Sequence, residues 1–146
     1  TRSAWEDLSV ARAGRPILLR EEGEASGLIQ GSRSHLRQLL RNLLDNALSA
    51  TVEVATSRDT PAEIVVSFDD QGDESRMLRV EVRDSGPGFT PGQARDVFEP
   101  FFTTKIRGTG LGLAICARIV QAHGGSIVAQ EGGPGGRVHF ALPRRK

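Results

Sequence analysis

The stretch GTGLGLAI, residues 108–115, places three glycines directly ahead of an apolar helical pattern that continues to His123. The first amide groups of a helix have no partner within it, and the helix dipole adds partial positive charge at that end. Glycines at the start of the helix leave these donors accessible, so the stretch predicts a phosphate site. A flexible linker is the alternative, but Leu111, Leu113 and Ile115 would serve no purpose in one.

Two common phosphate-binding loops do not fit this stretch. A P-loop requires a Gly-Lys pair followed by Ser or Thr, and the chain contains no Gly-Lys pair. A dinucleotide-binding loop requires G-x-G-x-x-G, but the sixth position counted from Gly108 is Leu113. A nucleotide site in this chain therefore needs other motifs.

The sequence NLLDNA, residues 42–47, is the first of these motifs. Apolar residues recur at helical spacing from Leu36 to Leu48, and Ser32 or Ser34 is the expected cap. Asn42 and Asn46 share one face of this helix. An amide oxygen is a suitable ligand for Mg²⁺ that phosphates and water otherwise coordinate. The alternative is that both residues only border the buried stripe.

The sequence DSGPGF, residues 84–89, is the second motif and follows an expected strand at 78–82. The Asp84 carboxylate can accept a hydrogen bond from an exocyclic amine, while Gly86 and Gly88 let a flat ring approach the backbone. This favours adenine over guanine, which has a carbonyl at that position. An ordinary local turn of the same composition is the alternative.

The segment VFEPFFTTK, residues 97–105, lies between the two glycine motifs. Four of the seven aromatic residues fall in this neighbourhood: Phe89, Phe98, Phe101 and Phe102. They form either a satellite core or the hinge of a mobile cover. Lys105 and Arg107 could reach phosphate from such a cover, although exposed basic residues are commonly only solvated.

The order of the expected elements is mixed, which predicts an α+β two-layer domain rather than a doubly wound one. We expect helices at 32–48, 91–97 and 111–123, and strands at 17–20, 52–55, 64–68, 78–82, 127–130 and 138–142. Residues 1–16 are expected to be a connector and residues 17–146 the domain. Cys116 is the only cysteine, and its apolar neighbours indicate a buried thiol.

Bulk properties exclude several classes of partner. The net charge is +1, and the basic residues form no stripe that would bind nucleic acid. No apolar run approaches the roughly 18 residues of a membrane span. We therefore expect a cytoplasmic segment that is not inserted in a membrane, whether or not its parent protein is anchored in the inner membrane.

The motifs together resemble the catalytic ATP-binding domain of bacterial two-component sensor histidine kinases, a family that also includes gyrase, Hsp90 and MutL. The resemblance spans residues 17–143, with the N box at 39–47, the first glycine box at 84–89, the phenylalanine box at 98–105 and the second glycine box at 108–113. It implies a Bergerat-type sandwich: a mixed sheet of about five strands covered by three helices, with ATP under a lid. The phenylalanine box is most similar to the nitrogen-regulation branch.

The resemblance also implies roles for individual residues. Asn46 would coordinate Mg²⁺, Asp84 would bind the adenine amine, and Gly110 and Gly112 would approach the phosphates. Hydrolytic members have Glu where this chain has Asn42, and because an amide cannot act as a base, phosphoryl transfer is favoured. The candidate nucleotide site comprises Asn42, Asn46, Asp84, Gly86, Gly88, Phe89, Thr103, Thr104, Lys105, Gly108, Thr109, Gly110, Leu111, Gly112 and Leu113, with Asn42, Asn46 and Lys105 as catalytic residues.

The implied partners are a dimerisation domain of the same kinase, which carries the acceptor histidine, and a response regulator downstream. His35, His123 and His139 are not expected acceptors, because they lie in the N-box helix, at a helix end and in the last strand. An anti-sigma-type serine kinase or a pseudokinase of the same fold is the alternative. The chain departs from the family at Gly136, where Thr or Ser is common.

Overall fold

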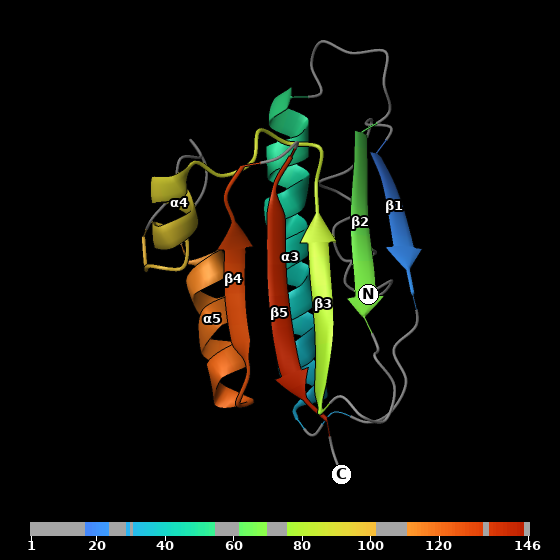
Figure 1. Ribbon diagram of the computed structural model, residues 1–146, viewed down its shortest axis with the longest axis vertical. Helices are drawn as coiled ribbons and strands as arrows, with labels where there is room; N and C mark the ends of the chain where they lie inside the picture. The colour runs from blue at the N-terminus through green and yellow to red at the C-terminus, as the bar shows by residue number, and fades with distance from the viewer. Residues whose placement is uncertain are drawn as a thin grey trace.

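The computed structural model describes residues 17–23, 29, 31–54, 62–69, 76–101, 111–132 and 135–144. Figure 1 shows a sheet with helices on one face. The elements follow the order β1 (Ile17–Glu22), α3 (Arg33–Val54), β2 (Ala62–Asp69), β3 (Met77–Arg83), α4 (Pro91–Asp96), α5 (Gly112–Ala122), β4 (Ser126–Gln130) and β5 (Arg137–Pro143). The predicted connector at 1–16 lies outside the described residues.

The five strands form one sheet in the order β1-β2-β3-β5-β4. β1 runs parallel to β2, whereas the β2–β3, β3–β5 and β4–β5 pairs are antiparallel. α3 and α5 cover one face, and α4 lies beside β4 (Figure 1). The predicted α+β class, with a mixed five-stranded sheet and three helices, is confirmed for the described residues.

The strand predicted at 52–55 is wrong, because α3 continues through Val54. β-branched residues in this segment favour a strand locally, which is why the sequence pattern misleads. The buried stripe nevertheless continues at helical spacing through Leu44, Leu48 and Thr51, each at most 3% exposed. Packing of that stripe against the sheet outweighs the local preference.

Local signals explain where the helices begin and end. The amide of His35 donates to Ser32 Oγ at 3.4 Å, so Ser32 is the cap of α3. Thr90 and Gln93 form a reciprocal capping box at the start of α4, with Pro91 in its first turn. α5 ends as predicted at a glycine pair, where Gly124 has a φ of 77°.

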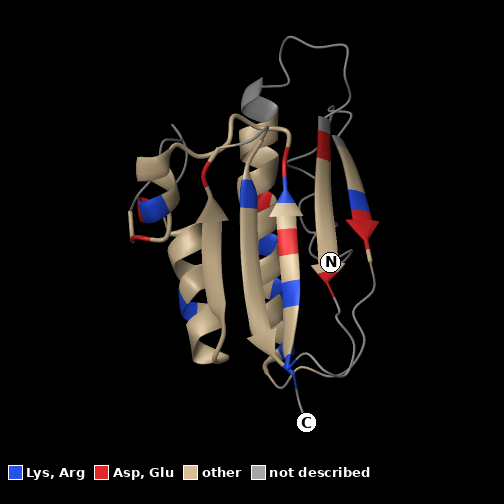
Figure 2. Ribbon diagram, in the orientation of Figure 1, with Lys and Arg blue, Asp and Glu red and all other residues tan. Residues whose placement is uncertain are grey.

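The core lies between the helix-facing side of the sheet and the two longer helices. It includes Leu39, Leu43, Leu44, Ala47, Leu48, Ile64, Val66, Leu78, Val80, Val82, Cys116, Ile119, Val120, Val138, Phe140 and Leu142. On the opposite face of the sheet, charged residues recur at alternate positions of β3 (Figure 2). The layers therefore place the ends of α3, β3 and α5 near one end of the sheet, where the turn at residues 84–89 lies.

Candidate functional site

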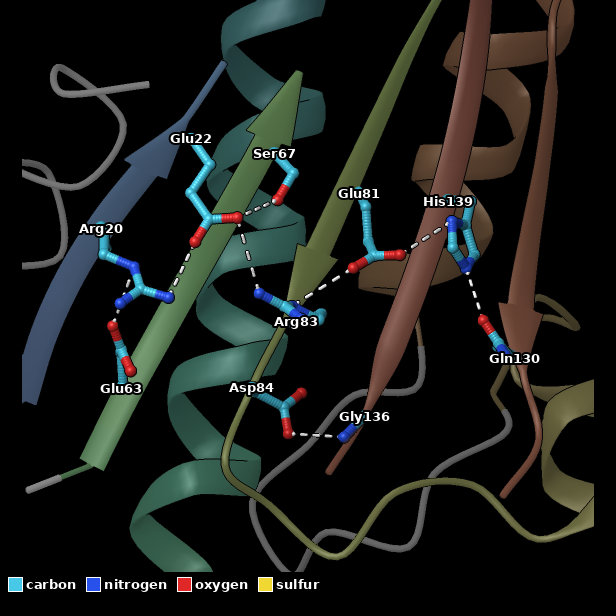
Figure 3. A network of polar contacts seen from close by, with 10 residues as sticks. All are labelled: Arg20, Glu22, Glu63, Ser67, Glu81, Arg83, Asp84, Gln130, Gly136 and His139. Carbon is cyan, nitrogen blue, oxygen red and sulfur yellow. Dashed lines mark hydrogen bonds and ion pairs between the residues drawn. The ribbon is translucent and has the colours of Figure 1, made fainter. Parts of the chain in front are cut away.

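Asp84 directly follows β3, and the backbone of two separate segments holds its carboxylate. Oδ1 accepts a hydrogen bond from the Gly86 amide at 2.8 Å. It also accepts one from the Gly136 amide at 3.0 Å (Figure 3). The Asp84 amide in turn donates to the Gly136 carbonyl at 2.9 Å. These bonds fix the orientation of the carboxylate, because they approach it from both its own turn and the segment before β5.

Gly135 and Gly136 enclose Asp84 so closely that neither position has room for a side chain. Gly135 has a φ of 83°, and a Cβ there would overlap the Asp84 carbonyl oxygen. A Cβ on Gly136 would lie 2.6 Å from Asp84 Oδ2. The sequence pattern treats Gly136 only as a departure from the family. In the structure, Gly136 contacts the Asp84 carboxylate. The run of glycines between β4 and β5 is the sequence feature that could have indicated this close contact.

The fold itself requires glycine at two positions of the DSGPGF turn. A Cβ on Gly86 would lie 2.7 Å from the Ala50 Cβ and 2.8 Å from the Ala50 carbonyl oxygen, so this glycine lets the turn contact α3. Gly88 has a φ of 81°, in the left-handed region. The predicted role of both glycines in admitting a flat ring stays a prediction.

Phe89 ties the turn to the end of β4. It forms a parallel bridge with Glu131, and its carbonyl accepts a hydrogen bond from the Gly132 amide at 3.1 Å. Its half-buried side chain packs against the core, as does that of Phe98. Phe101, by contrast, is 75% exposed with a φ of 66°. Phe101 therefore does not share a core with Phe89 and Phe98, and Phe102 lies outside the described residues.

Asn42 and Asn46 are half-buried on α3, and Asn42 lies where that helix meets α5. Its buried Nδ2 lies beside the Cys116 thiol, and no other hydrogen-bond partner is found for it among the described residues. Burial raises the pKa of the Cys116 thiol to about 12, while the Asn42 amide acts in the opposite direction. The thiol itself donates weakly to the Leu39 carbonyl. Asn42 thus contacts α5 at this thiol, and its role in the nucleotide site stays a prediction.

The sequence predicts a phosphate site at the start of α5, and this role stays a prediction. Leu111 is the residue before the helix, and its apolar side chain makes no capping hydrogen bond. A Cβ on Gly112 would meet nothing within 4 Å among the described atoms, so packing in this part of the structure does not require the glycine. Leu113 packs against the core and anchors the first turn. Amide groups at this end could therefore receive an anion.

Six predicted site residues lie outside the described residues: Thr103, Thr104, Lys105, Gly108, Thr109 and Gly110. Their roles, and the idea of a mobile cover, stay predictions. Among the described residues, the turn that contains Asp84 contacts α3 where Gly86 meets Ala50. α3 in turn packs against α5.

A groove of about 430 Å³ lies on the open face of the sheet, away from the predicted site. Its lining comprises Ser67, Asp69, Arg79, Val80, Glu81, Ser126, Val128, His139, Phe140 and Ala141. An exposed ion pair beside it joins Arg20 to Glu22 at 2.8 Å, and a half-buried pair joins Arg83 to Glu81 at 3.3 Å (Figure 3). Such pairs typically contribute about 1 kcal/mol or less. None of the predicted nucleotide residues that the structure describes lines this groove.

The described histidines have local partners. His123 Nδ1 lies 2.7 Å from the Ile119 carbonyl, and its ring packs on Gly31 and edge-on to His35. His139 lies 3.3 Å from Glu81 and 2.8 Å from Gln130 Oε1. Within the described ranges, no helix is both long and apolar enough to cross a membrane.

The sequence matches the profile of one protein family over residues 31–146. That family is described as the histidine kinase-, DNA gyrase B- and HSP90-like ATPases. The match includes both asparagines, both glycine boxes and the Gly135-Gly136 pair that contacts Asp84.

Several sensor proteins are similar in sequence. The C4-dicarboxylate transport sensor protein DctB of Pseudomonas aeruginosa is 40% identical over 134 residues, which cover 88% of this chain and 21% of DctB. The sensor histidine kinase ZraS of Klebsiella oxytoca is 40% identical over 142 residues, or 97% of this chain and 27% of ZraS. The chain thus spans about a quarter or less of these relatives.

Solved structures of histidine kinases share the fold. The catalytic domain of the histidine kinase ThkA has a TM-score of 0.79 at 30% identity, covering 98% of this chain and 89% of that one. The mycobacterial sensor histidine kinase MprB has a TM-score of 0.77 at 26% identity, covering 99% of this chain and 91% of that one.

Proposed function

The chain belongs to the family of histidine kinase-, DNA gyrase B- and HSP90-like ATPases, and from that premise we propose that it binds Mg-ATP and donates the γ-phosphoryl group to a histidine on a separate domain. The ATP-binding catalytic domain of sensor histidine kinases is the form of this family that the similar proteins represent. The anti-sigma-type kinase and pseudokinase alternatives are not favoured by these similarities.

The observation that carries the proposal is the double backbone support of the Asp84 carboxylate. Gly86 and Gly136 both donate to Oδ1, so the side chain has a defined orientation before any ligand arrives. A pre-oriented acceptor recognises the adenine amine with less loss of conformational freedom on binding. This support is stronger than an ordinary turn would need, because Gly136 comes from a segment 52 residues away.

The two asparagines would serve the phosphate end of the site. The side-chain amide of Asn42 would donate to a phosphate oxygen, and the amide oxygen of Asn46 would be a ligand of Mg²⁺. When bound, the ion neutralises negative charge on the phosphate oxygens. Because neither amide can accept a proton from water, the site favours transfer to a protein acceptor over hydrolysis.

The remaining predicted residues would complete the phosphate cradle. The amides at the start of α5, with Gly112 and the glycines from Gly108, would receive the β- and γ-phosphates. Lys105, Thr103 and Thr104 would act from the phenylalanine box. The chain would thus catalyse mainly by positioning and charge neutralisation, leaving proton transfer to groups near the acceptor.

The acceptor and the downstream partner would lie outside this segment. We propose a dimerisation domain of the same kinase as the first partner and a response regulator as the second. One similar structure is of ThkA in complex with the response regulator protein TrrA, with a TM-score of 0.76 at 27% identity. We further propose a cytoplasmic location, with residues 1–16 as a connector and 17–146 as the domain.

Asn46→Ala is expected to weaken Mg-ATP binding more than it weakens binding of metal-free ATP, because the lost amide is the proposed ligand of the ion. Calorimetry with and without Mg²⁺ measures the difference. Gln38→Ala, at an exposed position of the same helix, is the control and should change neither affinity. Equal losses under both conditions would mean that Asn46 supports only the helix.

The isolated chain is expected to bind ATP yet acquire no stable phosphohistidine, because His123 and His139 have local structural partners and the acceptor is elsewhere. Incubation with γ-labelled ATP and a separate helical-hairpin domain of a related kinase should label that domain. The label should be acid-labile, whereas an acid-stable phosphoserine would favour the serine kinase alternative. Rapid labelling of His35, His123 or His139 would contradict the proposal.

A further inference from the structure

Ser85, the residue between Asp84 and Gly86, makes an unusual pair of hydrogen bonds with β2. Its hydroxyl donates to the Glu63 carbonyl at 2.9 Å and accepts from the Glu63 amide at 3.1 Å. The Ser85 Oγ therefore forms hydrogen bonds with both the amide and the carbonyl of Glu63.

The strand register explains why Ser85 is opposite Glu63. β2 and β3 pair antiparallel from Asp69 opposite Arg79 to Val65 opposite Arg83. Continued by two residues, that register places Glu63 opposite Ser85. In a regular ladder the two backbones would exchange both hydrogen bonds. Here the Ser85 hydroxyl makes the two hydrogen bonds that the Ser85 backbone would make in a regular ladder. The main chain can therefore turn away from β2 after Asp84 and still be held to that strand.

We propose that Ser85 is a positioning residue that holds the Asp84 carboxylate in place for recognition of the adenine amine. This inference rests on the proposed function. The turn is held on three sides: by Ser85 to β2, by the contact of Gly86 with Ala50 on α3, and by the bond of Asp84 to Gly136. Of these three contacts, the hydrogen bonds of Ser85 are the ones that hold the turn to β2, next to the end of β3.

Removing the hydroxyl should affect base selectivity and not only stability. Glu63 is partly exposed, so its freed main-chain groups can bind water and the fold should persist. Asp84 would then lose its support on one side and sample more orientations. Because the carboxylate attracts the amine of adenine and repels the carbonyl of guanine, a less well-oriented carboxylate discriminates less between the two bases.

Displacement of a fluorescent ATP analogue by ATP and by GTP, measured on the intact chain, tests the proposal. Ser85→Ala should lower ATP affinity about 3- to 10-fold, the range for one or two lost hydrogen bonds, and lower GTP affinity less. Ser85→Thr keeps the hydroxyl and should restore the wild-type ratio. Ser85→Cys, with a similar volume but a weak donor and acceptor, is a second loss variant.

Ser67→Ala is the matched control, because Ser67 lies on β2 and its hydroxyl bonds only weakly to Glu22 at 3.4 Å, away from the turn. It should leave both affinities unchanged. An ATP-to-GTP ratio equal to that of the wild type in both Ser85→Ala and Ser85→Cys would overturn the positioning role while leaving the proposed function intact. Failure of the wild-type chain to bind ATP would instead overturn the proposed function and this inference with it.

Discussion

Asp84→Asn is expected to weaken ATP binding roughly 10- to 100-fold, which corresponds to about 1.5 to 3 kcal/mol for a lost charge-assisted hydrogen bond. The amide presents either a second donor or a weaker, neutral acceptor to the adenine amine. The fold should persist, because the amide oxygen can still accept from Gly86 and Gly136. Calorimetry gives the affinity, and thermal unfolding reports the fold.

Asp69→Asn is the matched control for this variant. Asp69 is an exposed carboxylate at the other end of β2, beside the groove on the open face of the sheet. The same change of charge there should leave ATP affinity unaltered. Wild-type affinity in a folded Asp84→Asn protein would remove this residue from the site.

Gly135→Ala is expected to lower the free energy of unfolding by about 3 kcal/mol or more and to abolish measurable ATP binding. Two costs add at this position. The backbone φ of 83° is unfavourable for alanine, and the new methyl group would overlap the Asp84 carbonyl oxygen. Relief of that overlap requires the segment before β5 to move away from Asp84, which breaks its hydrogen bonds with Gly136.

Gly132→Ala separates the two costs. Gly132 has a similar φ of 74°, but a Cβ there would meet nothing within 4 Å among the described atoms. It should therefore show only the conformational cost of roughly 1 to 2 kcal/mol and retain ATP binding. Urea unfolding of both variants, with ATP affinity measured on each, gives the comparison. Equal effects at the two positions would contradict the close contact between residue 135 and Asp84.

The glycine boxes and the asparagine pair could be predicted from sequence because each depends on local chemistry. Helical spacing alone places Asn42 and Asn46 on one face, and the composition of DSGPGF alone predicts a turn after a strand. The hairpin of β2 and β3 and the closing hairpin of β4 and β5 follow from short β-rich runs separated by turn residues. The strand pairing confirms the two hairpins, whereas the roles of the glycine boxes and the asparagines stay predictions.

The end of α3 could not be predicted in this way. The run from Thr51 to Val54 has the composition of a strand, and only the sheet beneath it makes Thr51 a buried helical position. The contacts of Asp84 could not be predicted from the sequence either. Gly136 and Ser85 become its supports only when β5 and β2 lie on either side of β3.

The sequence by itself determined the fold class, the order of the motifs and the type of chemistry, because helical periodicity, turn composition and side-chain functional groups are local properties. Only the tertiary structure decided which backbone groups orient Asp84 and that the Asn42 side chain lies beside the Cys116 thiol. These features depend on contacts between segments far apart in the chain, and such contacts follow from packing the whole sheet against its helices.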